Sequence, residues 1–173
     1  MNELDIIKAN ITDVNQLQII GRKTFFETFK EANTEEDMKQ YLKDNFSSQK
    51  LDAELSNINS EFYFAQIKGR VVGYLKINFG PSQTEQIAAN SLEIERIYVL
   101  KEFQGKRVGQ LLYNKALEIG SNYNHDFVWL GVWEKNPKAI DFYTKNGFVA
   151  FDKHIFKLGN DAQTDILMKL MLK

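Results

Sequence analysis

The sequence predicts a single α/β domain, residues 1–173, in which a mixed, mostly antiparallel sheet is covered by helices. Three observations predict this fold class. Runs of β-branched and aromatic residues alternate with helical patterns along the second half of the chain. Short glycine turns join pairs of such runs into hairpins. No linker, repeat or low-complexity tract divides the chain.

The N-terminal half is expected to form one strand, three helices and a hairpin. Thr12 or Asp13 is a capping residue for a helix that ends near Phe29, and Thr34 with the acidic run behind it begins a second helix. The turn Lys68-Gly69-Arg70 separates two aromatic and β-branched runs. The expected bounds are strand 4–9, helices 12–29, 35–45 and 49–58, and strands 62–67 and 71–79.

The C-terminal half is expected to alternate strands and helices and to close on a hairpin. Pro137 directly after Asn136 favours the first turn of a helix, and Asn146-Gly147 is typical of its end. The expected bounds are strand 92–100, helix 110–120, strand 127–133, helix 137–146, and strands 148–158 and 164–172.

Composition and charge exclude several function classes. A net charge of −1 argues against nucleic acid as the main partner. No apolar run approaches the roughly 20 residues of a membrane span, and the acidic N-terminus lacks a signal-peptide core, so we expect a cytoplasmic protein. Without cysteine there is no thiolate nucleophile, and the two separate histidines, His125 and His154, do not indicate a metal site.

The charges are unevenly distributed. Residues 1–62 carry 12 acidic against 7 basic side chains, and residues 63–173 carry 11 against 15. This asymmetry suits a cationic substrate on one side and a polyanionic cofactor on the other, although solvated surfaces show similar asymmetry by chance.

The stretch 104–110 indicates an anion site, because it lies where a predicted strand turns into a helix whose first backbone N–H groups are free. The Walker phosphate loop is excluded since Arg107, and not Ser or Thr, follows Gly-Lys. The dinucleotide fingerprint is excluded by the spacing of Gly105 and Gly109. The alternative is a plain strand-to-helix turn that needs two small residues.

A second motif lies roughly 30 residues downstream and consists of Asn136, Ala139, Phe142, Tyr143, Gly147 and Phe148. Together the two motifs resemble those of the GNAT superfamily of N-acetyltransferases, with Arg107 in place of a usual glycine. An arginine fits there with a negative φ, and its guanidinium would then reach a phosphate. Further segments, 24–31, 92–99, 129–136 and 163–165, resemble the PaiA-type spermidine/spermine acetyltransferases.

The resemblance implies the GNAT fold, acetyl-CoA as cosubstrate and no metal. It places the donor on the following residues: Ile97, Tyr98, Val99, Gln104, Gly105, Lys106, Arg107, Val108, Gly109, Gln110, Asn136 and Tyr143. Tyr143 would be the general acid for the departing thiolate, since a phenol of pKa about 10 can protonate a thiolate whose conjugate acid has a pKa of about 8.5. The alternative is a core tyrosine. Without cysteine, transfer would be direct, within a ternary complex.

Glu93 and Glu95 are the candidate general bases, because they share one face of the strand beside the expected thioester. Either would act directly or through water, and the alternative is a solvated face that pairs with Arg96 or Lys101. A bulge in the strand would change which side chains share this face, so the choice between the two acids is left open.

The acceptor site is expected near the first two helices. Phe25, Phe29 and Tyr41 would flank the methylenes of a polyamine, and Glu27 and Glu31 would bind its ammonium groups. Spermidine or spermine is the leading acceptor. Protein N-termini, ribosomal proteins, aminoglycosides and a non-catalytic acyl-CoA sensor remain alternatives, and the oligomeric state, including a homodimer, is left open.

Overall fold

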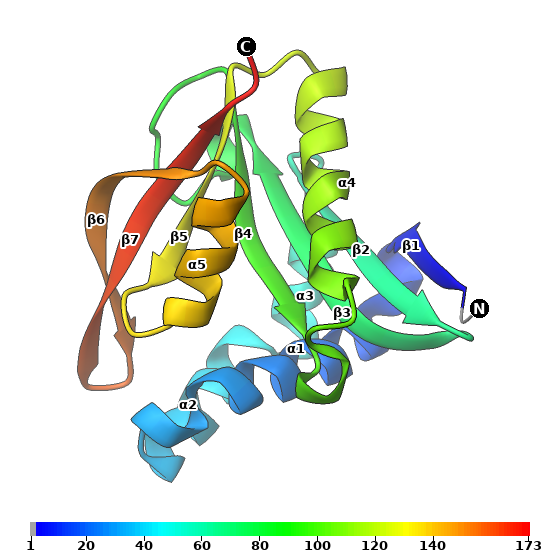
Figure 1. The fold of residues 1–173 in the computed structure, drawn as a ribbon. Coiled ribbons are helices and arrows are strands. Elements are labelled where there is room, and N and C mark those ends of the chain that lie inside the picture. The colour runs from blue at the N-terminus through cyan, green and yellow to red at the C-terminus, as the bar shows by residue number, and fades with distance from the viewer. Residues whose placement is uncertain (1–2) are drawn as a thin grey trace.

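The computed structural model describes residues 3–173, which form one seven-stranded sheet and five α-helices (Figure 1). The strands are β1 Leu4–Lys8, β2 Ser60–Ile67, β3 Arg70–Phe79, β4 Ser91–Val99, β5 Phe127–Trp133, β6 Val149–Leu158 and β7 Asp161–Met171. The helices are α1 Val14–Phe29, α2 Glu35–Asn45, α3 Ser48–Leu55, α4 Val108–Asn122 and α5 Pro137–Lys145. The predicted fold class is confirmed.

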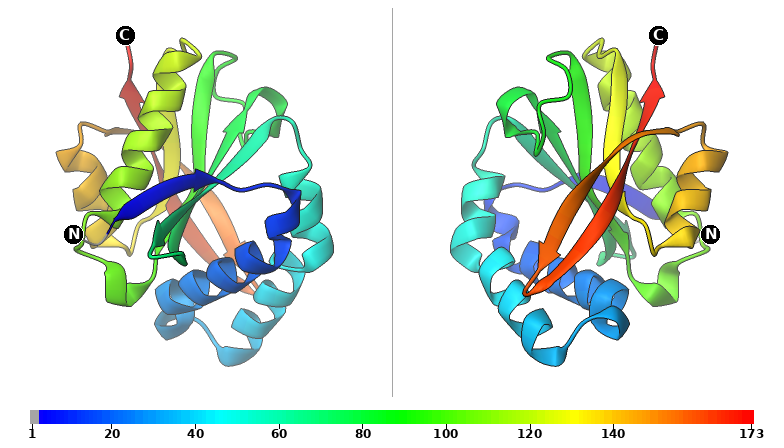
Figure 2. Two further views of the ribbon diagram at one scale, coloured as in Figure 1. Left: turned by 90° about the vertical axis from the view of Figure 1, so that its right-hand side faces the viewer. Right: turned by 90° about the vertical axis from the view of Figure 1, so that its left-hand side faces the viewer.

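The sheet has the order β1-β2-β3-β4-β5-β7-β6, and only β4 and β5 run parallel. Helices α4 and α5 lie on one face and α1, α2 and α3 on the other (Figure 2). Each helical layer has its own apolar core against the sheet. Leu112 and Tyr143 belong to the first core, and Leu17 and Phe25 belong to the second.

Local sequence explains where the helices begin. The Thr34 side chain caps α2 by accepting a hydrogen bond from the Asp37 N–H, and Asn136 caps α5, whose first residue is Pro137. Helix α4 begins two residues earlier than expected because the turn ends at Arg107. Within residues 3–173 no helix is both long and apolar enough to cross a bilayer.

Strands β4 and β5 separate halfway along their length. They pair only from Ser91 to Ile94 on β4 and from Phe127 to Leu130 on β5, and each strand then continues without the other. Separated strands leave backbone groups without a sheet partner. The sheet therefore contains a gap between the last residues of β4 and those of β5.

A bulge interrupts β4 at the start of this gap. Ile94 pairs with Ile77 and Arg96 with Lys76, so Glu95 is an extra residue opposite β3. The bulge changes which side chains face which layer. Ile97 then packs with the α4 core and Tyr98 with the α1 core.

Candidate active site

The turn before α4 presents unsatisfied backbone N–H groups at one face of the sheet. Gly105 and Arg107 have φ angles of +76° and +66°, and no side chain caps the helix. The expected negative φ of Arg107 is therefore wrong. The turn needs a left-handed residue directly before the helix, and arginine adopts this conformation at a cost of about 1 kcal/mol. An uncapped helix N-terminus favours anionic groups.

Side chains tie this turn to its neighbours. Gln104 Nε2 donates to the Val99 carbonyl at 3.2 Å, and Lys138 Nζ donates to Gln104 Oε1 at 3.1 Å. Gln110 Nε2 donates to Asn146 Oδ1 at 3.2 Å. Lys106 Nζ lies 5.2 Å from the centre of the Phe103 ring, which leaves its charge beside the turn. The turn is thus fixed to β4 and α5.

The β4 backbone faces the gap at Ile97 and Val99. The Leu100 N–H donates to the Val72 carbonyl on β3. Because backbone groups alternate in direction along a strand, those of Ile97 and Val99 point away from β3, toward β5. The side chains of Ile97 and Val99 pack in the α4 core.

Tyr143 lies on the same side of the sheet as the α4 turn. It is buried in the α4–α5 core, against the rings of Phe142 and Phe148. Burial, and to a smaller extent Tyr113, raises the pKa of Tyr143 above its ordinary value, so the phenol keeps its proton at neutral pH. Asn136 accepts a hydrogen bond from the Ala139 N–H at 3.3 Å, and its side-chain oxygen therefore serves the helix cap.

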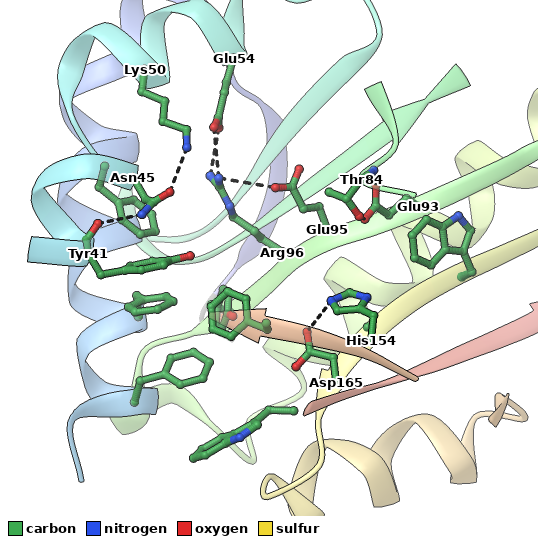
Figure 3. A pocket seen from close by; sticks show the side chains of 18 residues that line it. Tyr41, Asn45, Lys50, Glu54, Thr84, Glu93, Glu95, Arg96, His154 and Asp165 are labelled. Carbon is green, nitrogen blue, oxygen red and sulfur yellow. Dashed lines mark hydrogen bonds and ion pairs between the residues drawn. The ribbon is translucent and has the colours of Figure 1, made fainter. Parts of the chain in front are cut away.

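A cavity of about 310 Å³ occupies the opposite side of the sheet (Figure 3). Its aromatic lining comes from Phe25, Phe29, Tyr41, Phe46, Tyr98, Trp129, Trp133 and Phe156. Its carboxylates are Glu54, Glu93, Glu95 and Asp165, and its basic residues are Lys50, Arg96 and His154. Tyr98, predicted to contact the donor, also lines this cavity with its side chain.

The structure brings three of the five predicted acceptor residues together. Phe25 stacks on Phe29 and on Tyr41, with ring centres 4.5 Å apart in each pair. Glu27 and Glu31 do not line the cavity. The Glu27 carboxylate accepts a hydrogen bond from the Lys101 N–H at 2.8 Å, and Glu31 is exposed. Glu27 lies on the side of α1 that faces away from the cavity, and Glu31 follows the end of α1. The reason is that the helix turns its aromatic face toward the cavity.

Glu93 is a buried carboxylate on the cavity wall and is 3% exposed. It accepts hydrogen bonds from the Thr84 N–H at 2.8 Å, from the Thr84 hydroxyl and from Asn78 Nδ2 at 3.0 Å. Burial raises the pKa of Glu93 above its ordinary value, and these hydrogen bonds only partly offset the rise. A carboxylate with a raised pKa is a stronger base.

Glu95 lies on the same face and shares Asn78, whose Nδ2 donates to it at 2.7 Å. Its electrostatic surroundings are different. Lys76 Nζ lies 2.5 Å and Arg96 Nη2 lies 3.6 Å from its oxygens. Burial alone would raise the pKa of Glu95, but Arg96 and Lys76 outweigh burial and lower it. The two carboxylates therefore differ: Glu95 is ion-paired with Lys76 and Arg96, whereas Glu93 has hydrogen bonds that only partly offset the cost of its burial.

Sequence reasoning missed Glu54, Trp133, His154 and Asp165 as cavity residues. Trp133 and Asp165 lie in segments singled out for their resemblance, and the pairing register of the closing hairpin places His154 opposite Asp165. Glu54, on α3, carries no signal in the sequence. Among residues 3–173 no three potential metal ligands cluster together.

The fold, the uncapped α4 turn and the gap between β4 and β5 together define an acyltransferase of the GNAT class. A family model described as "Acetyltransferase (GNAT) family" matches residues 22–148, and the chain belongs to this family of N-acetyltransferases, which use acetyl-CoA. An uncharacterized N-acetyltransferase from the pepI 3′ region of Lactobacillus delbrueckii subsp. lactis is 40% identical over 99% of both chains.

Two further comparisons concern proteins of Thermoplasma acidophilum. A spermidine N(1)-acetyltransferase of Thermoplasma acidophilum is 26% identical over 86% of this chain and 90% of its own. The crystal structure of the PaiA N-acetyltransferase of the same organism, solved with coenzyme A, superposes with a TM-score of 0.80 at 24% identity. The superposition covers 98% of this chain and 99% of the other, and it supports the fold.

Proposed function

We propose that the chain is a cytoplasmic enzyme that transfers the acetyl group of acetyl-CoA directly to a primary amine of a small polyamine, with spermidine or spermine as acceptor. The observation that carries the proposal is the cavity behind the β4–β5 gap. It combines aromatic faces with carboxylates, of which Glu93 has a raised pKa. Such a lining suits the methylenes and ammonium groups of a polyamine. The named Thermoplasma relative supports the same acceptor class.

The donor side fits a pyrophosphate. The N–H groups at the start of α4 have no side-chain cap, and the space beside Gly105 contains no atom within 4 Å of where a Cβ would stand. Lys106, Arg107 and Lys138 add positive charge around the turn. A pyrophosphate bound there would direct the acyl group along the backbone of β4 toward the gap.

The reaction follows from the groups on the two sides of the gap. Glu93 takes a proton from the ammonium group, and the amine nitrogen then bonds to the carbonyl carbon of the thioester. A backbone N–H of β4 that faces the gap stabilises the developing oxyanion. The carbon–sulfur bond breaks, and Tyr143 gives its proton to the departing thiolate. The bonded nitrogen gives up its second proton, which restores the Tyr143 phenol, and Glu93 releases the proton that it took to solvent. The products are the acetylated amine, CoA and one proton.

An amine panel tests the proposal. The purified protein is given acetyl-CoA with spermidine, spermine, a peptide with a free N-terminus or an aminoglycoside, and the release of the CoA thiol is followed. We expect turnover with the polyamines and at least ten times lower kcat/KM with the other acceptors. Turnover with peptides and none with spermidine contradicts the acceptor. Tight acetyl-CoA binding by calorimetry without turnover on any amine indicates a regulatory acyl-CoA sensor.

A further inference from the structure

Three side chains form a row across the strands at one wall of the cavity. Trp133 on β5 pairs with Asp165 on β7, and Asp165 pairs with His154 on β6. Directly paired residues of antiparallel strands lie on the same face, within reach of each other. All three line the cavity, where His154 and Asp165 lie across from Glu93 (Figure 3).

The Asp165 carboxylate has no strong cationic partner. Its side chain is 17% exposed, and the nearest basic group is His154 Nε2 at 3.4 Å. No lysine or arginine nitrogen of the described chain, residues 3–173, lies within 4 Å of it. By contrast, Glu54 and Glu95 share Lys76 and Arg96. Asp165 therefore lines the cavity with an imidazole as its nearest basic group.

A second carboxylate adds to the negative charge around His154. Glu85 Oε1 lies 2.6 Å from His154 Nδ1, although the angle is not that of a hydrogen bond. One imidazole therefore stands between Glu85 and Asp165. A single protonated ring neutralises one carboxylate at most, so the group keeps an attraction for a further cation. Burial raises the pKa of Asp165, and His154 partly opposes the rise.

Aromatic rings line the same cavity. The ring centres of Trp133 and Phe29 lie 5.3 Å apart, and those of Phe29 and Phe156 lie 6.2 Å apart. The Trp133 Nε1 atom is buried without a hydrogen-bond partner within the described residues. A carboxylate in a cavity lined by tryptophan and phenylalanine suits an alkylammonium group, which can gain both ion pairing and cation–π attraction.

We propose that Asp165, between Trp133 and His154, binds a second ammonium group of the acceptor while Glu93 receives the reacting amine. The proposal rests on the proposed function and deepens it, because it makes the enzyme selective for amines that carry two cationic groups. Gly131 borders the same two side chains: a Cβ there would lie 3.5 Å from Asp165 Oδ2 and 3.6 Å from His154 Cε1.

A chain-length-matched pair of amines tests the second subsite. We compare kcat/KM for spermidine, a four-carbon diamine and butylamine in the wild type and in Asp165→Asn. Losing a charge-assisted contact should lower kcat/KM for spermidine and the diamine by about 10- to 100-fold, with a change below about 3-fold for butylamine. Asp152→Asn, an exposed carboxylate on β6 outside the cavity, is the charge-matched control and should change neither.

A binding measurement tests the subsite without turnover, and a second variant tests it without relying on the folding of Asp165→Asn. Calorimetric titration of spermidine into the CoA-saturated protein should show Kd raised by the same factor in Asp165→Asn. Gly131→Ala, whose added methyl meets its neighbours at ordinary distances of 3.4 Å or more, should cause the same selective loss for diamines even where Asp165→Asn folds poorly.

The outcomes separate this subsite from the proposed function. Equal losses for butylamine and the diamine, or an Asp165→Asn variant that keeps spermidine turnover and affinity, overturn the second-ammonium site alone. A wild type that acetylates peptides and no diamine overturns both.

Discussion

The two sides of the β4–β5 gap are built differently. The proposed donor side is built around a contiguous turn, residues 104–110, that offers backbone N–H groups at the start of α4. The proposed acceptor side is a cavity assembled from side chains of α1, α2, α3, β4, β5, β6 and β7. A backbone site tolerates replacement of its side chains, whereas a side-chain site depends on each charge.

This difference predicts where substitutions matter. Changes in the acceptor cavity should alter rate, acceptor choice or stability strongly, because its carboxylates are buried or half-buried. Changes in the turn should have small effects as long as its left-handed residues keep their conformation.

Glu93→Gln should have the largest effect. The amide cannot take the proton of the attacking ammonium, and we expect kcat/KM to fall by about 10²- to 10⁴-fold. In the wild type kcat/KM should rise with pH through the raised pKa of Glu93, since the base must be ionised. The variant should lose this limb of the pH profile. A profile that is unchanged in Glu93→Gln would assign the base to another group.

The free energy of unfolding should also depend on the ionisation of Glu93, but it should fall with rising pH where kcat/KM rises. Because the pKa of Glu93 is raised in the folded state, the protonated form is favoured by folding. The free energy of unfolding should therefore fall as the pH rises through that pKa, and Glu93→Gln should flatten this dependence. Chemical denaturation at several pH values measures it.

Tyr143→Phe tests the donor side at its one predicted catalytic side chain. Without the phenol proton the thiolate leaves unprotonated, and kcat should fall by about 10²-fold with KM for acetyl-CoA little changed. Tyr113→Phe is the matched control, since its hydroxyl donates to the Asn146 carbonyl in the same core. Equal effects of the two variants would indicate that Tyr143 serves packing alone.

Glu95→Gln should affect stability more than chemistry. Glu95 compensates Lys76 and Arg96, whose side chains are 7% and 13% exposed, and removing one partner of a buried pair leaves charge uncompensated. We expect the free energy of unfolding to fall by about 2–3 kcal/mol. Glu118→Gln, an exposed partner of Lys115, is the control and should cost less than about 0.5 kcal/mol.

The pH dependence of this loss has a definite sign. The pKa of Glu95 is lowered in the folded state, so its ionisation stabilises the fold above its ordinary pKa. That stabilisation disappears as the pH falls through the folded pKa. Glu95→Gln should therefore differ most from the wild type near neutral pH and least in acid.

The same contrast explains how much the sequence could predict. The donor motif lies within a few residues, so its strand, turn and helix follow from local patterns, and α2 and β5 have the predicted bounds. Which side chains of β4 point to which face of the sheet depends on the bulge at Glu95. The bulge arises from pairing with β3, and the local sequence does not show its position. Glu27 shows the limit on the acceptor side: its charge suggested the pocket, but the aromatic face of α1 turns inward.

Arg107→Gly should have the smallest effect and should be stabilising. Glycine adopts a φ of +66° without steric cost, although it also adds freedom to the unfolded chain. We expect the free energy of unfolding to rise by about 0.5–1 kcal/mol. Lys106→Gly should instead be destabilising, because it adds conformational freedom to the unfolded chain and removes no left-handed residue from the folded one. Equal destabilisation of both variants would contradict strain at Arg107. A rise in KM for acetyl-CoA in Arg107→Gly would measure what its guanidinium adds to the backbone N–H groups.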